Sequence, residues 1–329
     1  MPLDLVRLRQ ASAVRTRKYT VKLLTPMFSH GWQEEVEDNN GKSRMHPVTD
    51  ETRAPSLRGV LRFWWRAAIA EDNVGALLRC ESLLFGGTAG DNGESGCKSP
   101  VTVRIKPLQE RTPIPLRPHR DATRVIAISQ RRDMVIELVQ TNSRVPEDYY
   151  HNLMTLFFCL GSMGQRARRG TGAIQWTGFN WASPVDFQTS LRTSLTGLGL
   201  ESDFVFSDEQ GTGKVVERKH VHRYTRPRLL RVWLGKAYRD AEAARIAISA
   251  AASACNPRGG GQQYLGQAEE SKLNRSRLAS PLWCTVRKVG RSYHPVISEL
   301  DNMYLGTNQE TAYLRARDGF LGRLGVTGI

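Results

Sequence analysis

Alternating apolar and polar residues predict short strands in the first half of the chain, and a period near 3.6 predicts two helices between them. The predicted strands are 18–26, 101–106, 135–139 and 173–181, and the predicted helices are 53–70 and 146–160. The order strand, helix, strand, strand, helix, strand is typical of a ferredoxin-like fold, in which both helices cover one face of an antiparallel sheet.

The same kinds of pattern recur in the second half of the chain. Helices are predicted at 187–198 and 236–255, and strands at 229–234, 282–289 and 293–300. We therefore expect an α+β protein with two tandem ferredoxin-like domains of the RAMP or RRM kind, each an antiparallel sheet with helices on one face. The first domain is expected over residues 1–183 with a glycine-rich loop, and the second over residues 184–329 with a C-terminal tail.

Two segments interrupt the first pattern. Residues 31–52 are polar and locally acidic, and are interpreted as an excursion loop. Residues 107–133 form a long basic connection with prolines at 107, 113, 115 and 118. Because proline removes a ladder hydrogen bond, a regular hairpin is not expected in this connection.

The charge changes the picture from a fold to a function. Of 47 basic residues, 37 are arginine and 10 are lysine, and the formal net charge is +15. The guanidinium group matches phosphate oxygens with a planar fork of donors and stacks on bases. The excess therefore indicates a polyanionic partner, most simply nucleic acid. A genome rich in GC, which favours arginine codons, is the alternative explanation.

Other protein classes fit the sequence poorly. The N-terminus has no apolar core of a secretory signal, and no apolar run approaches the roughly 18 residues of a membrane span. The five cysteines are never spaced as CxxC, so neither a disulfide framework nor a cysteine zinc site is expected. We expect a cytoplasmic protein that has no membrane partner, metal or cofactor.

The first candidate motif is the arginine-rich helix entry RAPSLRGVLRFWWR, residues 53–66. At 100° per residue Arg58, Arg62 and Arg66 share one face, and Ser56 is a plausible N-cap. Like charges at this spacing repel, and a phosphate chain at the helix N-terminus would relieve the repulsion. A solvated basic face is the simpler alternative.

The second candidate motif is the loop GSMGQRARRGTG, residues 161–172. Glycines permit positive φ and close approach to a ligand, and the loop contains no GxxxxGK[ST] string of an ATP-binding P-loop. The candidate RNA-binding residues here are Gly164, Gln165, Arg166, Arg168 and Arg169. The alternative is a tight solvated turn.

The third candidate is the basic stretch 218–228, which contains His220, His222 and Tyr224. Basic residues interleaved with an aromatic residue suit single-stranded RNA. Its candidate RNA-binding residues are Arg223, Arg226 and Arg228. A His-x-His pair could also serve in acid–base or metal chemistry.

The strings RAPSLRGVLRFWWRA, ESLLFGG and GSMGQRARRGTG together resemble the first-subunit family of the Cmr module, the type III-B CRISPR effector, within the RAMP superfamily. RLASPLW, residues 277–283, resembles the second half of such proteins. The resemblance covers roughly residues 18–300.

The resemblance implies two ferredoxin-like folds and a non-catalytic RNA-binding subunit. Such a subunit holds the 3′ region of the guide (CRISPR) RNA, the 5′ part of the target RNA, or both, beside other Cmr subunits that include the backbone RAMP proteins. It also implies that Arg53, Ser56, Arg58 and Arg62 line the RNA groove, and that the glycine loop grips the RNA backbone. Arg66, on the same helix face, is a further candidate RNA-binding residue. Two alternatives stay open, namely a metal-independent RAMP endoribonuclease that processes guide RNA and a DNA-binding architectural protein.

Overall fold

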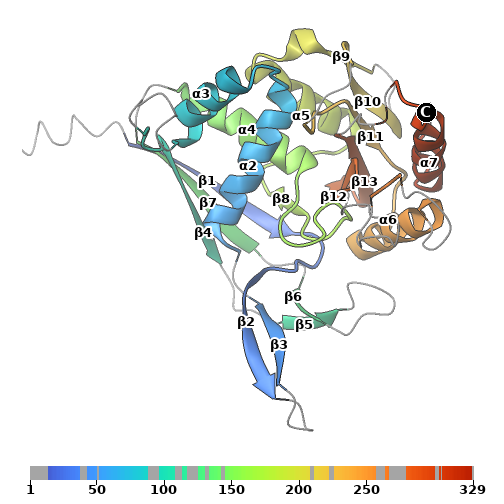
Figure 1. Cartoon of the computed structure of the whole chain (residues 1–329), viewed down its shortest axis with the longest axis horizontal. Coiled ribbons are helices and arrows are strands. Elements are labelled where there is room, and N and C mark those ends of the chain that lie inside the picture. Colours follow the sequence, from blue (N-terminus) through green and yellow to red (C-terminus); the bar gives the residue numbers. More distant parts are fainter. Residues whose placement is uncertain are drawn as a thin grey trace, which may run out of the picture.

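The computed structural model contains two antiparallel sheets that lie side by side (Figure 1). It describes residues 14–37, 43–49, 52–87, 96–107, 113–116, 125–129, 133–141, 145–207, 211–221, 226–256, 264–266, 279–300, 304 and 306–327.

The first sheet has the ferredoxin-like strand order β4-β7-β1-β8. Its strands are β1 (Arg15–Leu23), β4 (Val101–Pro107), β7 (Asp133–Gln140) and β8 (Ile174–Trp176). Its helices are α2 (Ala54–Ile69) and α3 (Val74–Phe85) between β1 and β4, and α4 (Glu147–Leu160) between β7 and β8. Tyr19, Val21 and Leu23 of β1 point to the helices and are buried, whereas Lys18 and Lys22 point to the other face. The predicted order of the first unit is therefore confirmed.

Two hairpins leave the first sheet at the same end and project away from the body (Figure 1). One hairpin pairs β2 (His30–Glu37) with β3 (Ser43–Thr49), and the other pairs β5 (Pro113–Leu116) with β6 (Val125–Ile128). The predicted loop at 31–52 was wrong, because a polar two-stranded ladder lacks the one-sided apolar alternation that marks a strand. The prolines of β5 are compatible with pairing because a two-stranded ladder leaves one edge of each strand free of hydrogen bonds.

The second sheet has the order β12-β13-β11-β10-β9. Its strands are β9 (Phe204–Phe206), β10 (Gly213–Arg218), β11 (Arg231–Leu234), β12 (Leu282–Val289) and β13 (Ser292–Glu299). Its helices are α5 (Pro184–Gly197), the short η1 (Glu201–Asp203), α6 (Ala241–Cys255) and α7 (Glu310–Arg323). Four strands of this sheet repeat the spatial order of the first sheet, with β12, β13, β11 and β10 in the places of β4, β7, β1 and β8. The order along the chain differs, because β10 precedes β11, whereas its counterpart β8 is the last strand of the first unit. Strands β9 and β10 and helix α7 were not predicted.

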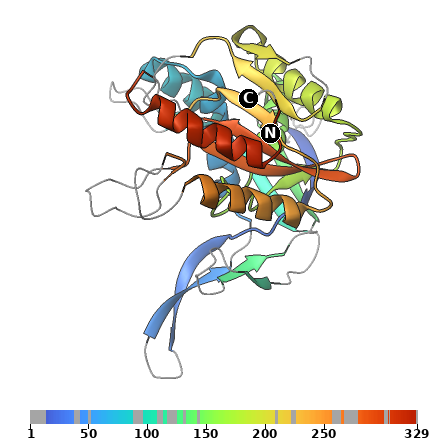
Figure 2. The ribbon, with the colours of Figure 1, turned by 90° about the vertical axis from the view of Figure 1, so that its right-hand side faces the viewer.

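Helix α4 is the layer between the two sheets. Every residue from Leu153 to Leu160 is buried, and all of them except Thr155 are apolar, so this half of the helix has no side that faces solvent. It contacts β8 of the first sheet and β12 and β13 of the second, while α6 packs on the opposite face of the second sheet beside α7 (Figure 2). The largest core cluster includes residues of both sheets. The expected boundary after residue 183 stays a prediction.

Candidate nucleic-acid interface

The N-terminal end of α2 is open to an anion. Its N-cap is Arg53, which is extended and makes no side-chain capping bond, and the first turn contains Pro55 and no acidic residue. By contrast, α3 is capped by Asn73 and α6 by Asp240. Ser56 is exposed in the first turn of the helix and is therefore not the predicted N-cap. Pro55 has no N–H to offer, but within the described part of the chain the other backbone N–H groups of this turn and the positive end of the helix dipole are available at this point.

The arginine stripe of α2 is bound by α3, although Arg62 and Arg66 stay partly exposed to solvent. The Arg58 guanidinium donates to the carbonyl of Phe85, and Arg62 forms an ion pair with Glu81. Arg66 donates to both oxygens of Glu81, at 2.7 and 2.6 Å. The repulsion within the stripe is therefore relieved inside the chain, so it does not by itself call for a phosphate ligand.

Glu81 is the residue that sequence reasoning missed at this site. It is 1% exposed, and it lies on α3, which the sequence analysis had not assigned as a helix. Burial opposes its ionisation, but the hydrogen bonds and charges of Arg66 and Arg62 outweigh burial and hold the pKa of Glu81 below its ordinary value. Glu81 is thus ionised at neutral pH and fixes α3 against α2.

The glycines of the second motif are required by the path of the chain itself. Gly172 has φ +63°, and a Cβ there would lie 1.8 Å from the carbonyl oxygen of Met163. Gly164 has φ +82°, and a Cβ there would lie 2.5 Å from the carbonyl oxygen of Phe28. The backbone approaches its own neighbours too closely for any side chain at these positions. A compact turn therefore accounts for these glycines without a ligand.

Two of the three arginines in the glycine loop point toward the second sheet. Arg168 donates to the carbonyl of Ser280, and its guanidinium lies 5.5 Å from the ring centre of Phe63 and 5.4 Å from that of Trp283. Arg169 donates to the carbonyl of Leu265 at 2.8 Å, and burial lowers its pKa. These two side chains attach the loop to the second half of the chain. Their assignment to RNA stays a prediction.

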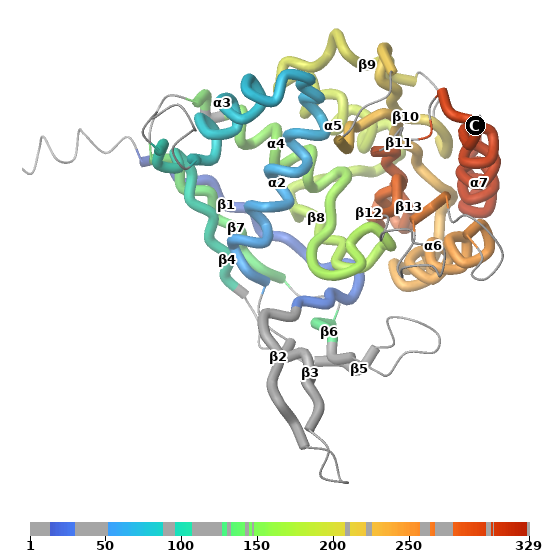
Figure 3. Tube along the Cα trace, in the orientation of Figure 1, coloured from blue at the N-terminus to red at the C-terminus, as the bar shows by residue number. Residues whose placement is uncertain are grey.

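The remaining residues of the loop meet the start of α2 at one place. The Gln165 N–H donates to the carbonyl of Phe28 at 2.7 Å, and the Thr52 hydroxyl lies 4.0 Å from the sulfur of Met27. Met27 pairs in turn with Ile128, the last residue of β6. We call Met27, Phe28 and Ile128 the hairpin root. The glycine loop lies beside the lower half of α2 (Figure 3). Arg53, Ser56, Gln165 and the half-buried Arg166 thus belong to segments that converge on this root.

The third basic stretch lies at the opposite end of α2. Arg218 donates to the carbonyl of Ala68, and Arg226 and Arg228 donate to Asp72. Since α2 has 16 residues, this cluster is about 24 Å from the N-terminal end of the helix. Arg223 and His222 lie outside the described residues, and His220 is exposed. The predicted arginines therefore form separate groups, of which one contacts the C-terminal end of α2.

Arg287 is a second residue that the sequence gave no reason to select. It is fully buried and donates to the carbonyls of Cys159, Gly161 and Val286 and to the hydroxyl of Thr285. Burial lowers its pKa to about 9, so the guanidinium is charged at pH 7. The carbonyls at the C-terminal end of α4 supply the negative partial charge that it faces. Arg287 thereby fixes the start of the glycine loop against β12.

Among the described residues, no group of three or more His, Cys, Asp or Glu side chains is placed to hold a metal ion. None of the described helices is both long and apolar enough to cross a bilayer.

Comparison with known proteins identifies a family for the first half of the chain. Residues 20–175 match the family model of the RAMP superfamily. This region belongs to the RAMP superfamily. The chain as a whole is similar in fold to the crystal structure of apo Cmr1 from Pyrococcus furiosus, with 16% identity, a TM-score of 0.54, and coverage of 94% of this chain and 97% of that chain.

A second similar structure is a chain of the type III-B Cmr-beta complex bound to cognate target RNA and AMPPnP in the presence of ssDNA. The identity is 10%, the TM-score is 0.52, and the match covers 93% of this chain and 98% of that chain. No curated protein matches the sequence. The predicted RAMP fold with two antiparallel sheets is therefore confirmed.

Proposed function

We propose that this RAMP protein is a non-catalytic RNA-binding subunit of a type III-B CRISPR effector complex. It holds single-stranded RNA, guide or target, at the hairpin root between the N-terminal end of α2 and the glycine loop. Its partners are the guide RNA, the target RNA and other Cmr subunits, including the backbone RAMP proteins. The similar fold of a Cmr complex chain bound to target RNA supports the class of complex.

The observation that carries the proposal is the state of the α2 N-terminus. This end has no side-chain cap and no first-turn acid, it begins at an arginine, and it lies beside exposed residues of the glycine loop. A phosphate group would accept hydrogen bonds from the free N–H groups and gain from the helix dipole. Arg53 and Ser56 are exposed beside it and supply a guanidinium and a hydroxyl.

The proposal revises the predicted set of RNA ligands by their surroundings. Arg53, Ser56, Gly164, Gln165 and Arg166 are the primary candidates because they lie on the segments that converge on the hairpin root. Arg58, Arg62, Arg66, Arg168 and Arg169 bind protein groups first, so they would support the interface rather than grip phosphates by themselves.

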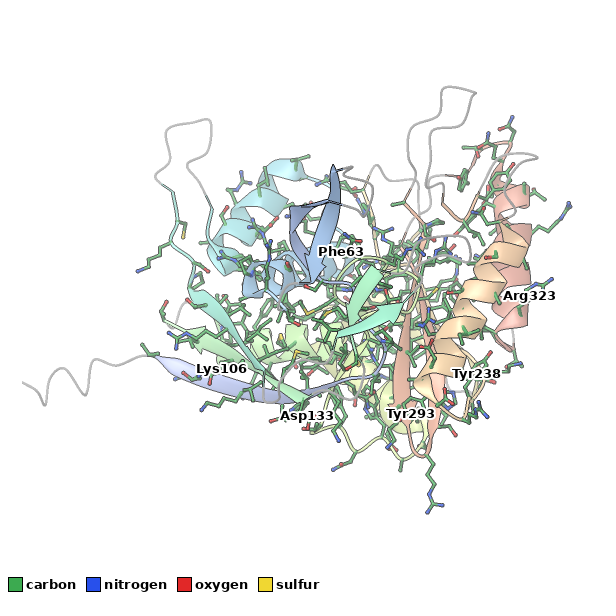
Figure 4. The ribbon with its side chains drawn as sticks, turned by 90° about the horizontal axis from the view of Figure 1, so that it is seen from below. Phe63, Lys106, Asp133, Tyr238, Tyr293 and Arg323 are labelled. Carbon is green, nitrogen blue, oxygen red and sulfur yellow. The ribbon has the colours of Figure 1, made fainter. Side chains whose placement is uncertain are left out.

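The test is RNA binding by the purified chain at several salt concentrations. If Arg53 and Arg166 each contact one phosphate, the double variant Arg53→Gln, Arg166→Gln should flatten the plot of log K against log [salt] by about 1.4, at about 0.7 per contact on a single strand. Arg323→Gln is the matched control, because Arg323 is exposed on α7, well away from Phe63 of α2 (Figure 4). An unchanged slope in the double variant would contradict the proposed interface.

Three further measurements separate the proposed function from its alternatives. Incubation with labelled repeat RNA in EDTA should leave the RNA intact, whereas specific cleavage lost in a single histidine variant would favour an endoribonuclease. Equal affinity for duplex DNA and single-stranded RNA at ~0.15 M salt would favour a DNA-binding protein. Copurification with the large and the backbone subunits would test the assignment to a Cmr complex.

A further inference from the structure

The outer face of the first sheet, opposite α2 and α4, carries a row of polar and cationic side chains. Side chains alternate between the two faces of a strand, so the outward positions can be read directly from β1 and β4. They are Thr16, Lys18, Thr20, Lys22, Thr102, Arg104 and Lys106. All of these except Thr20 are exposed, and Thr20 is partly buried. We call these seven residues the outer sheet face.

The cations of the outer sheet face are only partly neutralised. Lys18 and Lys106, whose side chains are 66% and 61% exposed, share the single carboxylate of Glu137, at 3.7 and 3.3 Å. Among the described residues, Lys22 and Arg104 have no carboxylate within 4.0 Å. The face therefore attracts an anion, and at least two of its cations need no internal pair to be broken.

The chemistry of the outer sheet face suits phosphates better than bases. The outward positions of β7 between β4 and β1 are Asp133, Val135, Glu137 and Val139, so no aromatic ring is available for stacking on any of these three strands. Ammonium, guanidinium and threonine hydroxyl groups all donate hydrogen bonds to phosphate oxygens. Such a face binds a nucleic-acid backbone without reading its sequence.

The outer sheet face is continuous with the hairpin root. Strand β1 ends at Leu23, a few residues before Met27 and Phe28, and Lys22 pairs with Asp133 at the same end of the sheet as Lys106, which pairs with Val135. Figure 4 shows Lys106 and Asp133 on β4 and β7 at this side of the molecule. An RNA strand that passes the hairpin root needs only to turn round the end of the sheet to reach Lys22 and Lys106.

We propose that the outer sheet face is a second, sequence-independent binding surface for the phosphate backbone of the RNA strand held at the hairpin root. This inference rests on the proposed function. The RNA strand runs from the α2 N-terminus round the end of the sheet, first to Lys22 and Lys106 and then to Lys18 and Arg104.

The test compares a short single-stranded RNA, which spans only the hairpin root, with a longer one that can reach the sheet. Lys22→Gln with Arg104→Gln removes two cations and keeps Lys18 and Lys106, the two ammonium groups that form ion pairs with Glu137. For the long RNA the slope of log K against log [salt] should flatten by about 1.4, and for the short RNA it should not change. Arg291→Gln with Arg323→Gln, two exposed arginines of the second half of the chain, should leave both slopes unchanged.

The outcomes separate the two proposals. If the long RNA gives an unchanged slope in Lys22→Gln, Arg104→Gln while Arg53→Gln, Arg166→Gln still flattens it, the outer sheet face is refuted and the proposed function stands. If neither RNA binds the wild-type chain, both proposals fail. If the sheet variant instead loses copurification of an acidic protein subunit at an unchanged RNA slope, the face binds protein and the inference is overturned.

Discussion

Replacing Arg287 by methionine should destabilise the fold by about 3 kcal/mol. Arg287 donates to acceptors at the C-terminal end of α4 and in β12, and charge-assisted hydrogen bonds of this kind contribute roughly 1.5–3 kcal/mol each. One Arg287 nitrogen lies within hydrogen-bond distance of both Phe157 O, at 3.5 Å, and Gly161 O, and these two carbonyls keep another donor in the variant. Phe157 O accepts from the Gly161 N–H at 2.6 Å, and Gly161 O accepts from the Thr285 hydroxyl at 3.3 Å.

The net loss of stability in Arg287→Met follows from the acceptor groups that the variant leaves without a hydrogen-bond donor. Within the described part of the chain, Cys159 O has no other donor, and an orphaned buried carbonyl costs about 1–3 kcal/mol. Removing a fully buried cation recovers part of its desolvation cost, which keeps the total well below the sum of the lost bonds. Arg287→Lys should be no milder than Arg287→Met, because lysine retains the buried charge but loses the planar fork.

Urea-induced unfolding, followed by far-UV circular dichroism and tryptophan fluorescence, measures this difference. The free energies of unfolding of both variants should fall by about 3 kcal/mol. RNA affinity should fall as well, because Gly161 begins the glycine loop. A change below about 1 kcal/mol in Arg287→Met, or full rescue by Arg287→Lys, would refute the view that the fork of hydrogen bonds holds α4 to β12.

Three further changes test the local arguments. Gly172→Ala should destabilise the fold by about 3 kcal/mol or more, because the added Cβ would lie 1.8 Å from Met163 O. Gly199→Ala is the control: Gly199 has φ +79° and open space around it, so this variant should cost only the backbone strain of about 1–2 kcal/mol. Similar thermal melting of the two variants would contradict this. Glu81→Gln should cost about 1–2 kcal/mol at pH 7, below the value for a fully buried pair because Arg62 and Arg66 are 33% and 47% exposed. Since the pKa of Glu81 is lowered in the folded chain, its contribution to the free energy of unfolding is complete above the unfolded pKa of about 4.3 and is lost as the pH falls through the folded pKa. The melting temperatures of wild type and Glu81→Gln should therefore converge at low pH. A difference that stays constant with pH would count against the ion pair. Arg168→Ala should lower stability with little effect on the salt slope of RNA binding, and a slope change of about 0.7 would instead place Arg168 on a phosphate.

The sequence predicted the first sheet well because its signals are local. The apolar positions of β1 and of α2 repeat with the periods of a strand and a helix, and the structure places those side chains in the core. The second half of α4, which is apolar except for Thr155, likewise indicated a buried helix, since no polar stripe was left for solvent. The hairpin at 30–49 was not predicted because neither of its faces is predominantly apolar.

The candidate site was harder to predict because partners come from distant positions. The Ser280 carbonyl that binds Arg168 is 112 residues away in the chain, and the Leu265 carbonyl that binds Arg169 is 96 residues away. A basic motif therefore does not distinguish an arginine that binds a phosphate from one that binds a carbonyl. Arg53 and Arg166, which belong to segments converging on the hairpin root, could be separated from the others only by the fold.

Photocrosslinking of single-stranded RNA that carries 4-thiouridine, followed by mass spectrometry of the linked peptides, tests the central claim most directly. The account predicts crosslinks in the segments 52–58 and 164–166, which converge on the hairpin root. Crosslinks confined to α6 and α7, with none at the start of α2 or in the glycine loop, would contradict it.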